Sequence, residues 1–231
     1  MSLRDAWDAQ AENWIAWTRG GVDAAFIGYN SAAFMELMPP PGELTIDLGA
    51  GEGRIGRILR TFGHRVVEFE QSRRLAEASA ELTPGAGVIA DVTRLPVRPA
   101  IADMAVAFMS FMDVDDMPVA VAEAARALRP GGTLMMAIVH PINSGGEFDK
   151  PGTTFTMYQS SYFVDRHYAD DVEREGVQMR FESRHRSVEA YSLALEAAGF
   201  VIEALREVGD PNPESKWNRI PLFLHVRARR A

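Results

Sequence analysis

The chain has 231 residues, 47% of them hydrophobic and 24% charged, a composition typical of a globular protein and unlike that of a disordered chain. It contains no cysteine, which excludes disulfides, thiolate metal sites and cysteine nucleophiles. Its net charge of −8, from 24 basic and 32 acidic residues, disfavours a nucleic-acid partner. This length predicts a single α/β domain over residues 1–231.

Residues 1–42 are predicted to form an N-terminal helical segment that covers part of the domain and ends at the proline-rich stretch Pro39-Pro40-Pro41-Gly42. Trp7, Ala11 and Trp14 recur at helical spacing, so they share one face, which we interpret chiefly as a core stripe. The first 17 residues lack the apolar core of a signal peptide, and no run approaches the roughly 20 apolar residues of a membrane span. We therefore expect a cytoplasmic protein without a membrane partner.

Strand and helix signals alternate from residue 44 to residue 140. Short apolar runs predict strands, and apolar residues at helical spacing predict the helices between them. Ser72 and Asp116 are the expected N-caps of two of these helices. This alternation predicts a parallel sheet with right-handed crossovers. The strands are expected at 44–49, 65–70, 87–90, 102–109 and 133–139, and the helices at 55–62, 72–82 and 116–128.

The pattern changes after His140-Pro141. Two stretches of period two, 155–164 and 177–183, predict strands, with Glu175-Gly176 as a turn, so residues 142–186 are interpreted as an insertion. After the insertion we expect a helix capped by Ser187 and two closing strands, at 200–208 and 222–227.

The strongest local signal is the loop Asp47-Leu48-Gly49-Ala50-Gly51-Glu52-Gly53. Glycines let the backbone turn sharply between a strand and a helix and approach a ligand closely. Gly51, Gly53 and Gly56 also match the spacing of a dinucleotide-binding fingerprint. The loop alone does not choose a cofactor, and a tight turn without a ligand is the alternative.

Further polar residues follow the second and third predicted strands. Glu70, followed by Gln71, ends the second strand, where a carboxylate can accept hydrogen bonds from both ribose hydroxyls of a nucleoside. Asp91 can accept the amino group of adenine, and Val92 offers its backbone N–H. Together these residues predict a site that binds an adenosine group at both its ribose and its adenine.

The order of these segments resembles the class I S-adenosylmethionine-dependent methyltransferases, in particular the small-molecule, type 11-like branch. The resemblance rests on the glycine loop, on Ala90-Asp91-Val92-Thr93-Arg94-Leu95-Pro96, and on the turn Arg126-x-Leu128-Arg129-Pro130-Gly131-Gly132. It implies a Rossmann-like, seven-stranded mixed sheet flanked by helices, in the order 3-2-1-4-5-7-6 with strand seven antiparallel. It also implies S-adenosylmethionine as the cofactor, bound near strands one and four.

The same resemblance implies roles for individual residues. Asp47 is expected near the methionine end of the cofactor and Glu70 at its ribose. Glu68 departs from the family pattern, because many relatives have a small residue at this position and an aspartate, shorter than Glu70, at the end of the strand. In the family an N-terminal helix often closes over the cofactor, so Trp14 or Arg19 is an alternative contact. The implied cofactor-binding set is Asp47, Gly49, Ala50, Gly51, Gly53, Glu70, Gln71, Asp91, Val92 and Met109.

Histidine supplies the candidate base. His140 ends the fifth predicted strand at the carboxyl edge, where an imidazole can take a proton from an attacking atom, and a structural role is the alternative. Arg184, His185 and Arg186 are interpreted as a solvated basic turn. The spacing of the five histidines indicates no metal site.

The predicted function is methyl transfer from S-adenosylmethionine to an oxygen, nitrogen or carbon of a small molecule, by a monomer or homodimer. Two alternatives are a non-catalytic sensor of S-adenosylmethionine and an NAD(P)-dependent oxidoreductase, which leaves Asp91 without a role. The insertion 142–186 is expected to form a lid over the acceptor, and a structural hairpin or dimer interface is its alternative. Its aromatic residues are Phe155, Tyr158, Tyr162, Phe163 and Tyr168.

Overall fold

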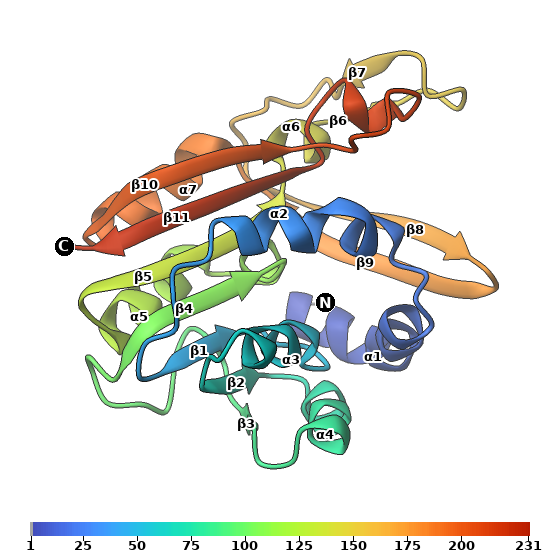
Figure 1. Cartoon of the computed structure of the whole chain (residues 1–231). Coiled ribbons are helices and arrows are strands. Elements are labelled where there is room, and N and C mark those ends of the chain that lie inside the picture. The colour runs from blue at the N-terminus through green and yellow to red at the C-terminus, as the bar shows by residue number, and fades with distance from the viewer. Residues whose placement is uncertain (1) are drawn as a thin grey trace.

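The computed structural model describes residues 2–231 and is built around a seven-stranded sheet in the order β3-β2-β1-β4-β5-β11-β10 (Figure 1). β11 pairs antiparallel with β5 and β10, and the other neighbours pair in parallel. The predicted fold is therefore confirmed. The strands are β1 (Thr45–Leu48), β2 (Val66–Glu70), β3 (Gly87–Ile89), β4 (Ala102–Phe108), β5 (Leu128–Val139), β10 (Phe200–Val208) and β11 (Phe223–Arg230).

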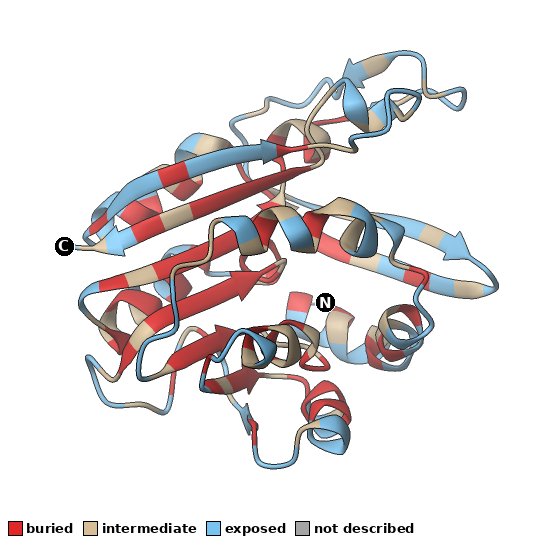
Figure 2. Ribbon diagram, viewed as in Figure 1, coloured by how far each residue is buried: buried red, intermediate tan, exposed pale blue. Residues whose placement is uncertain are grey.

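Helices pack on both faces of this sheet because its central strands are apolar on both sides. Met104 and Met135 face α2 (Ser31–Glu36) and α3 (Arg54–Thr61), whereas Ala105 and Met136 face α5 (Met117–Ala127) and α7 (Val188–Ala197). β4 and β5 are accordingly buried along most of their length (Figure 2). The helices are α1 (Leu3–Arg19), α2 (Ser31–Glu36), α3 (Arg54–Thr61), α4 (Arg73–Leu82), α5 (Met117–Ala127) and α7 (Val188–Ala197), with shorter turns η1 (Phe26–Asn30), η2 (Phe111–Asp113) and η3 (Lys216–Asn218).

Three of these helices begin at the predicted caps. The side chains of Ser72, Asp116 and Ser187 each accept a hydrogen bond from a backbone N–H in the first turn of α4, α5 and α7. A side-chain acceptor there satisfies one of the N–H groups that lack a partner within the helix. The boundaries of these helices therefore follow from local sequence.

The insertion consists of α6 (Pro141–Ser144) and two small antiparallel pairs, β6 (Gly146–Phe148) with β7 (Phe155–Met157) and β8 (Arg166–Arg174) with β9 (Val177–His185). The expected strand over 155–164 is wrong beyond Met157, and β8 was not predicted. β8 carries charged residues on both of its faces, so it has no apolar alternation to reveal it.

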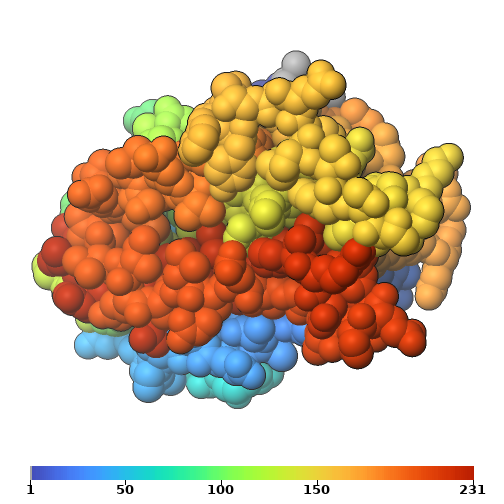
Figure 3. All heavy atoms as spheres, turned by 90° about the horizontal axis from the view of Figure 1, so that it is seen from above, coloured from blue at the N-terminus to red at the C-terminus, as the bar shows by residue number. Residues whose placement is uncertain are grey.

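The β8–β9 hairpin turns at Glu175 and Gly176, as predicted. Both residues have positive φ, 51° and 80°, which is the backbone of a type I′ turn. The hairpin packs on α1, and the arrowheads of β1 and β4 point toward this pair (Figure 1). Seen from above, the insertion forms part of the surface beside the C-terminal residues (Figure 3). Within residues 2–231, no helix is long and apolar enough to cross a membrane.

Candidate functional site

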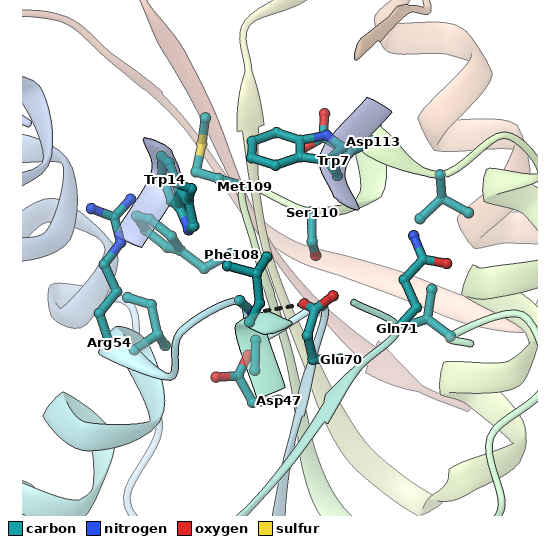
Figure 4. Close-up of a pocket in the computed structure, with 17 residues that line it drawn as sticks. Trp7, Trp14, Asp47, Arg54, Glu70, Gln71, Phe108, Met109, Ser110 and Asp113 are labelled. Atoms are coloured by element: carbon teal, nitrogen blue, oxygen red, sulfur yellow. Dashed lines mark hydrogen bonds between the residues drawn. The ribbon is translucent and has the colours of Figure 1, made fainter. Parts of the chain in front are cut away.

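A pocket with an empty volume of about 810 Å³ lies where β1 and β4 end, beside α1 (Figure 4). Its position is the carboxyl edge of the parallel strands, where ligands bind in open α/β sheets. Eight of the ten residues expected to bind a cofactor line it, and Gly53 and Asp91 do not. The lining residues are Trp7, Trp14, Asp47, Gly49, Ala50, Gly51, Arg54, Ile55, Glu70, Gln71, Leu75, Val92, Phe108, Met109, Ser110, Asp113 and Val114.

The glycine loop is held close to two neighbours. A Cβ atom on Gly49 would lie 2.6 Å from the Cβ atom of Ser110, and one on Gly51 would lie 3.2 Å from Nε1 of Trp14. Both glycines have positive φ, at 71° and 59°. Ser110 is fixed in turn, since its Oγ donates a 2.6 Å hydrogen bond to the carbonyl of Leu48. The loop therefore requires glycine at these positions for steric as well as conformational reasons.

Asp47 is the lining residue with an unsatisfied atom. Its side chain is buried, and Oδ2 has no hydrogen-bond partner among the described residues. Burial, followed by the nearby charge of Glu68, raises the pKa of this carboxyl well above its usual range, and Arg60 opposes the shift. A buried carboxylate oxygen without a donor is costly. It is available to a hydrogen-bond donor on a ligand.

Glu70 lies at the end of β2 with both oxygens engaged. Oε2 accepts a 2.8 Å bond from the N–H of Gly51, shown dashed in Figure 4, and Oε1 accepts one of 2.8 Å from the N–H of Ser72. Burial raises the pKa of Glu70, and these backbone donors lower it in part. Each carboxylate oxygen has a second lone-pair direction. Glu70 can therefore brace the loop and still accept from a ligand.

The unusual Glu68 has a structural explanation. It is buried on β2, where it accepts a 2.6 Å hydrogen bond from Arg60 on α3 and another from the hydroxyl of Ser79 on α4. A Cβ atom on Gly56 would lie only 2.1 Å from Oε1 of Glu68. The third glycine of the fingerprint thus leaves room for this buried carboxylate, which joins two helices to the sheet.

The two expected residues outside the lining have local roles. Gly53 is the N-cap of α3 with a left-handed backbone. Asp91 is exposed, and its Oδ1 accepts hydrogen bonds of 2.8 Å and 2.7 Å from the N–H and the hydroxyl of Thr93. Val92, which follows Asp91, does line the pocket. A role for Asp91 at the cofactor stays a prediction.

His140 lies away from the pocket lining. Its Nδ1 accepts a 3.0 Å hydrogen bond from the N–H of Ile142, and its Nε2 lies 3.0 Å from Oε1 of Glu207. Burial lowers the pKa of His140, and the charge of Glu207 opposes that shift. The imidazole therefore caps α6 and joins it to β10, and its role as a base stays a prediction.

Aromatic residues of α1 form a wall of the pocket, where the sequence pattern indicated chiefly a core stripe. The rings of Trp7 and Trp14 meet edge to face at 5.6 Å, and both rest against Phe181 of β9. Arg54 lies over Trp14 at 4.8 Å and forms a 2.7 Å ion pair with Asp23. The helical spacing of the tryptophans was the signal available for this wall.

The interpretation of residues 184–186 as a solvated turn is wrong for His185 and Arg186, which are buried. Arg186 donates bonds of 2.8 Å and 2.9 Å to the carbonyls of Val114 and Asp115. His185 is hydrogen-bonded through Nδ1 to the hydroxyl of Ser144 at 2.8 Å. The Arg186 bonds attach the end of the insertion to the segment after β4, and the His185 bond attaches it to α6, which a surface turn would not do.

The insertion contacts residues that line the pocket but does not itself line it. No residue of 142–186 is among the lining residues, but Ser183 donates a 2.5 Å bond to Asp113, and the backbone carbonyl of Glu182 accepts a 3.1 Å bond from Nε1 of Trp7. Across residues 2–231, no three His, Cys, Asp or Glu side chains form a group that could hold a metal ion.

Comparison with known proteins adds a family likeness. The family model described as a methyltransferase domain matches residues 46–136. An uncharacterized 37.1 kDa protein in transposon TN4556 of Streptomyces fradiae is 31% identical over 158 residues, covering 64% of this chain and 43% of that protein. The ubiquinone/menaquinone biosynthesis C-methyltransferase UbiE of Caulobacter sp. (strain K31) is 29% identical over 140 residues, covering 54% of this chain and 52% of the relative. The chain thus spans about half the length of these two relatives.

A solved structure shares the fold over most of both chains. The S-adenosylmethionine-dependent methyltransferase from Mesorhizobium loti aligns with a TM-score of 0.71 and 25% sequence identity. The alignment covers 86% of this chain and 96% of that chain. The likeness therefore includes elements outside residues 46–136, which the family model matches.

Proposed function

We propose that this chain is a class I S-adenosylmethionine-dependent methyltransferase that transfers the methyl group of S-adenosylmethionine to an oxygen, nitrogen or carbon of a small molecule. The methyltransferase family model over residues 46–136 and the fold shared with the Mesorhizobium loti methyltransferase support this proposal. The observation that carries the proposal is the unpartnered Oδ2 of Asp47 in the wall of the pocket, beside the glycine loop. A ligand with an amino or hydroxyl donor supplies the missing hydrogen bond. The residues present therefore fit this cofactor, which carries both kinds of donor.

In this proposal the chain's own residues hold and orient the reactants. Asp47 and the loop residues Gly49, Ala50 and Gly51 bind the methionine end, and Glu70 accepts from the ribose. The aromatic wall of Trp7 and Trp14 excludes water. The bound cofactor supplies a methyl group already activated on a sulfonium, so orientation of the acceptor accounts for most of the acceleration.

A small acceptor suits the lining and charge of the pocket. Apolar and aromatic side chains, among them Trp7, Trp14 and Phe108, line it together with a few polar groups, as is typical of small-molecule sites. The net charge of −8 opposes a polyanionic substrate. The insertion 142–186 completes the site in this proposal by positioning Asp113 and Trp7 through Ser183 and Glu182.

Calorimetry with the demethylated cofactor tests the assignment. S-adenosylhomocysteine should bind with a Kd of about 1–100 µM, and NAD should not bind at the same concentrations. Asp47→Asn should weaken binding about ten- to a hundredfold, because a hydrogen bond to a charged group contributes about 1.5–3 kcal/mol. Asp116→Asn, an exposed change in which asparagine still caps α5, is the matched control.

The same experiment addresses Asp91. If Asp91 accepts the adenine amino group, Asp91→Ala should cost about ten- to a hundredfold in affinity for S-adenosylhomocysteine. An unchanged affinity would remove Asp91 from the site and leave Val92 as the adenine contact. Binding of NAD in preference to S-adenosylhomocysteine would refute the proposed function as a whole.

A further inference from the structure

One carboxyl group of the pocket has no role in holding the cofactor as proposed above. Asp113 ends η2, the short turn after β4, and its side chain is buried and lines the pocket. In Figure 4 it lies beside Trp7 at the upper end of the view, whereas Asp47 and Glu70 lie at the lower end. Asp113 is thus separated from the glycine loop within the same pocket.

The position of Asp113 is fixed through one of its oxygens. Oδ1 accepts a 2.5 Å hydrogen bond from the hydroxyl of Ser183 on β9, which is itself buried. Arg186 binds the carbonyls of Val114 and Asp115 and so holds the backbone of this turn. Among the described residues, no donor is hydrogen-bonded to the other oxygen, Oδ2. The carboxyl group of Asp113 is therefore held in place by Ser183, and its Oδ2 can accept a hydrogen bond from a ligand.

The groups around Asp113 make the ionisation of its carboxyl group sensitive to a nearby cation. Burial raises its pKa well above the usual range, and Ser183 and the charge of Arg186 oppose that shift, while Glu70 adds to it. Two phenols, Tyr168 of β8 and Tyr191 of α7, also face this site, and burial raises the pKa of both. They stay neutral at physiological pH. A positive charge beside Oδ2 stabilises the ionised form of Asp113.

The charge of the whole pocket selects among acceptors. Its lining carries three carboxyl groups, on Asp47, Glu70 and Asp113, and one guanidinium, that of Arg54. That guanidinium is already paired with Asp23 at 2.7 Å. An anionic acceptor therefore finds no unpaired cation among the lining residues, whereas an ammonium meets carboxyl groups that it can ionise and the faces of aromatic rings.

We propose that Asp113 is the acceptor-binding residue and that the acceptor is a small primary or secondary amine. The inference rests on the proposed function and assigns the substrate class of the same pocket. The ammonium donates to Oδ2 of Asp113 and transfers one proton to it. The freed nitrogen lone pair forms the new N–C bond, the S–C bond of the sulfonium breaks with its electron pair going to sulfur, and the methylated amine leaves as an ammonium.

Binding experiments on the complex with S-adenosylhomocysteine test this inference without requiring turnover. The probes are linear and phenyl-substituted primary amines of two to ten carbons, each paired with the alcohol and the carboxylic acid of the same skeleton. We expect the best amine to bind at least about tenfold more tightly than its alcohol, as a charge-assisted hydrogen bond implies, and the acids to bind most weakly. Fluorescence of the pocket tryptophans or calorimetry reports binding.

Variants separate Asp113 from a general effect of charge. Asp113→Asn keeps the side-chain shape and an oxygen for Ser183, so it should remove the preference for amine over alcohol. Asp116→Asn, the same change three residues along at an exposed site, should retain it. Amine affinity of the native protein should rise between pH 4 and 8 as Asp113 ionises, and the Asp113→Asn protein should lack this rise.

The outcomes distinguish the two proposals. If S-adenosylhomocysteine does not bind, the proposed function fails. If it binds but no amine exceeds its alcohol, or if Asp113→Asn retains the preference, the proposed function stands and the amine inference is overturned. Because the amine and alcohol series uses the native protein, a folding defect in the variant does not decide the result.

Discussion

The close approach of Gly56 on α3 to Glu68 on β2 leads to a prediction about the stability of the folded protein. Gly56 lies in the first turn of α3, and a Cβ atom there would sit 2.1 Å from Oε1 of Glu68. Real Cβ atoms do not approach an oxygen that closely. Gly56→Ala must therefore displace the Glu68 carboxylate from Arg60 and from the hydroxyl of Ser79.

The cost follows from what the displaced carboxylate loses. Breaking a buried ion pair typically costs about 3–5 kcal/mol. The side chain of Arg60 is 25% exposed, so water can replace part of the hydrogen bonding that Arg60 loses. We therefore expect a loss of unfolding free energy at the lower end of this range, about 3 kcal/mol. In a Glu68→Ala background the added Cβ has space. There Gly56→Ala should be neutral or stabilise the helix by up to about 1 kcal/mol, the difference in helix propensity between alanine and glycine.

A double-mutant cycle measured by urea unfolding tests this reasoning. The two substitutions should couple by about 3 kcal/mol, so that the double variant is more stable than the sum of the single effects predicts. Gly28→Ala is the control, since a Cβ atom on Gly28 would have no other atom within 4 Å and the φ of Gly28 is not positive. Additivity of Gly56→Ala and Glu68→Ala within about 0.5 kcal/mol would refute the steric account.

Two further predictions concern pH and stability. The pKa of Asp113 in the folded protein is raised above its ordinary value of 3.8, so the native protein should lose stability as pH rises from about 4 through that raised pKa. Asp113→Asn should therefore raise the melting temperature most at pH 8 and least near pH 4, and an equal shift at both pH values would contradict this account. Burial lowers the pKa of His225 from 6.5 to about 4, so its contribution to stability is complete above pH 6.5 and is lost as pH falls to about 4. His225→Phe should remove up to about 3 kcal/mol of that acid-induced loss in urea unfolding, and an unchanged pH dependence would contradict the assignment.

Local sequence determined the seven strands of the main sheet and the helices between them, in order, but not the strands of the insertion, where β8 was missed. Side-chain caps such as Ser72, Asp116 and Ser187 act within four residues, so the starts of three helices were readable directly. The alternation of apolar strands and amphipathic helices predicted the parallel part of the sheet. The positive-φ loop at Gly49 and Gly51 also followed from residue type, because few other residues adopt that backbone.

Eight of the lining residues were expected from the sequence, but tertiary structure alone decided which distant side chains join and support them. Asp113 and Ser183 are 70 residues apart in the chain, and Trp7 and Glu182 are 175 apart, so no local pattern links either pair. Glu68 looked anomalous in the sequence because its partners, Arg60 and Ser79, lie on two different helices. Burial of a charge depends on such distant neighbours. For the same reason residues 184–186 read as a surface turn, whereas packing against the segment after β4 buries Arg186.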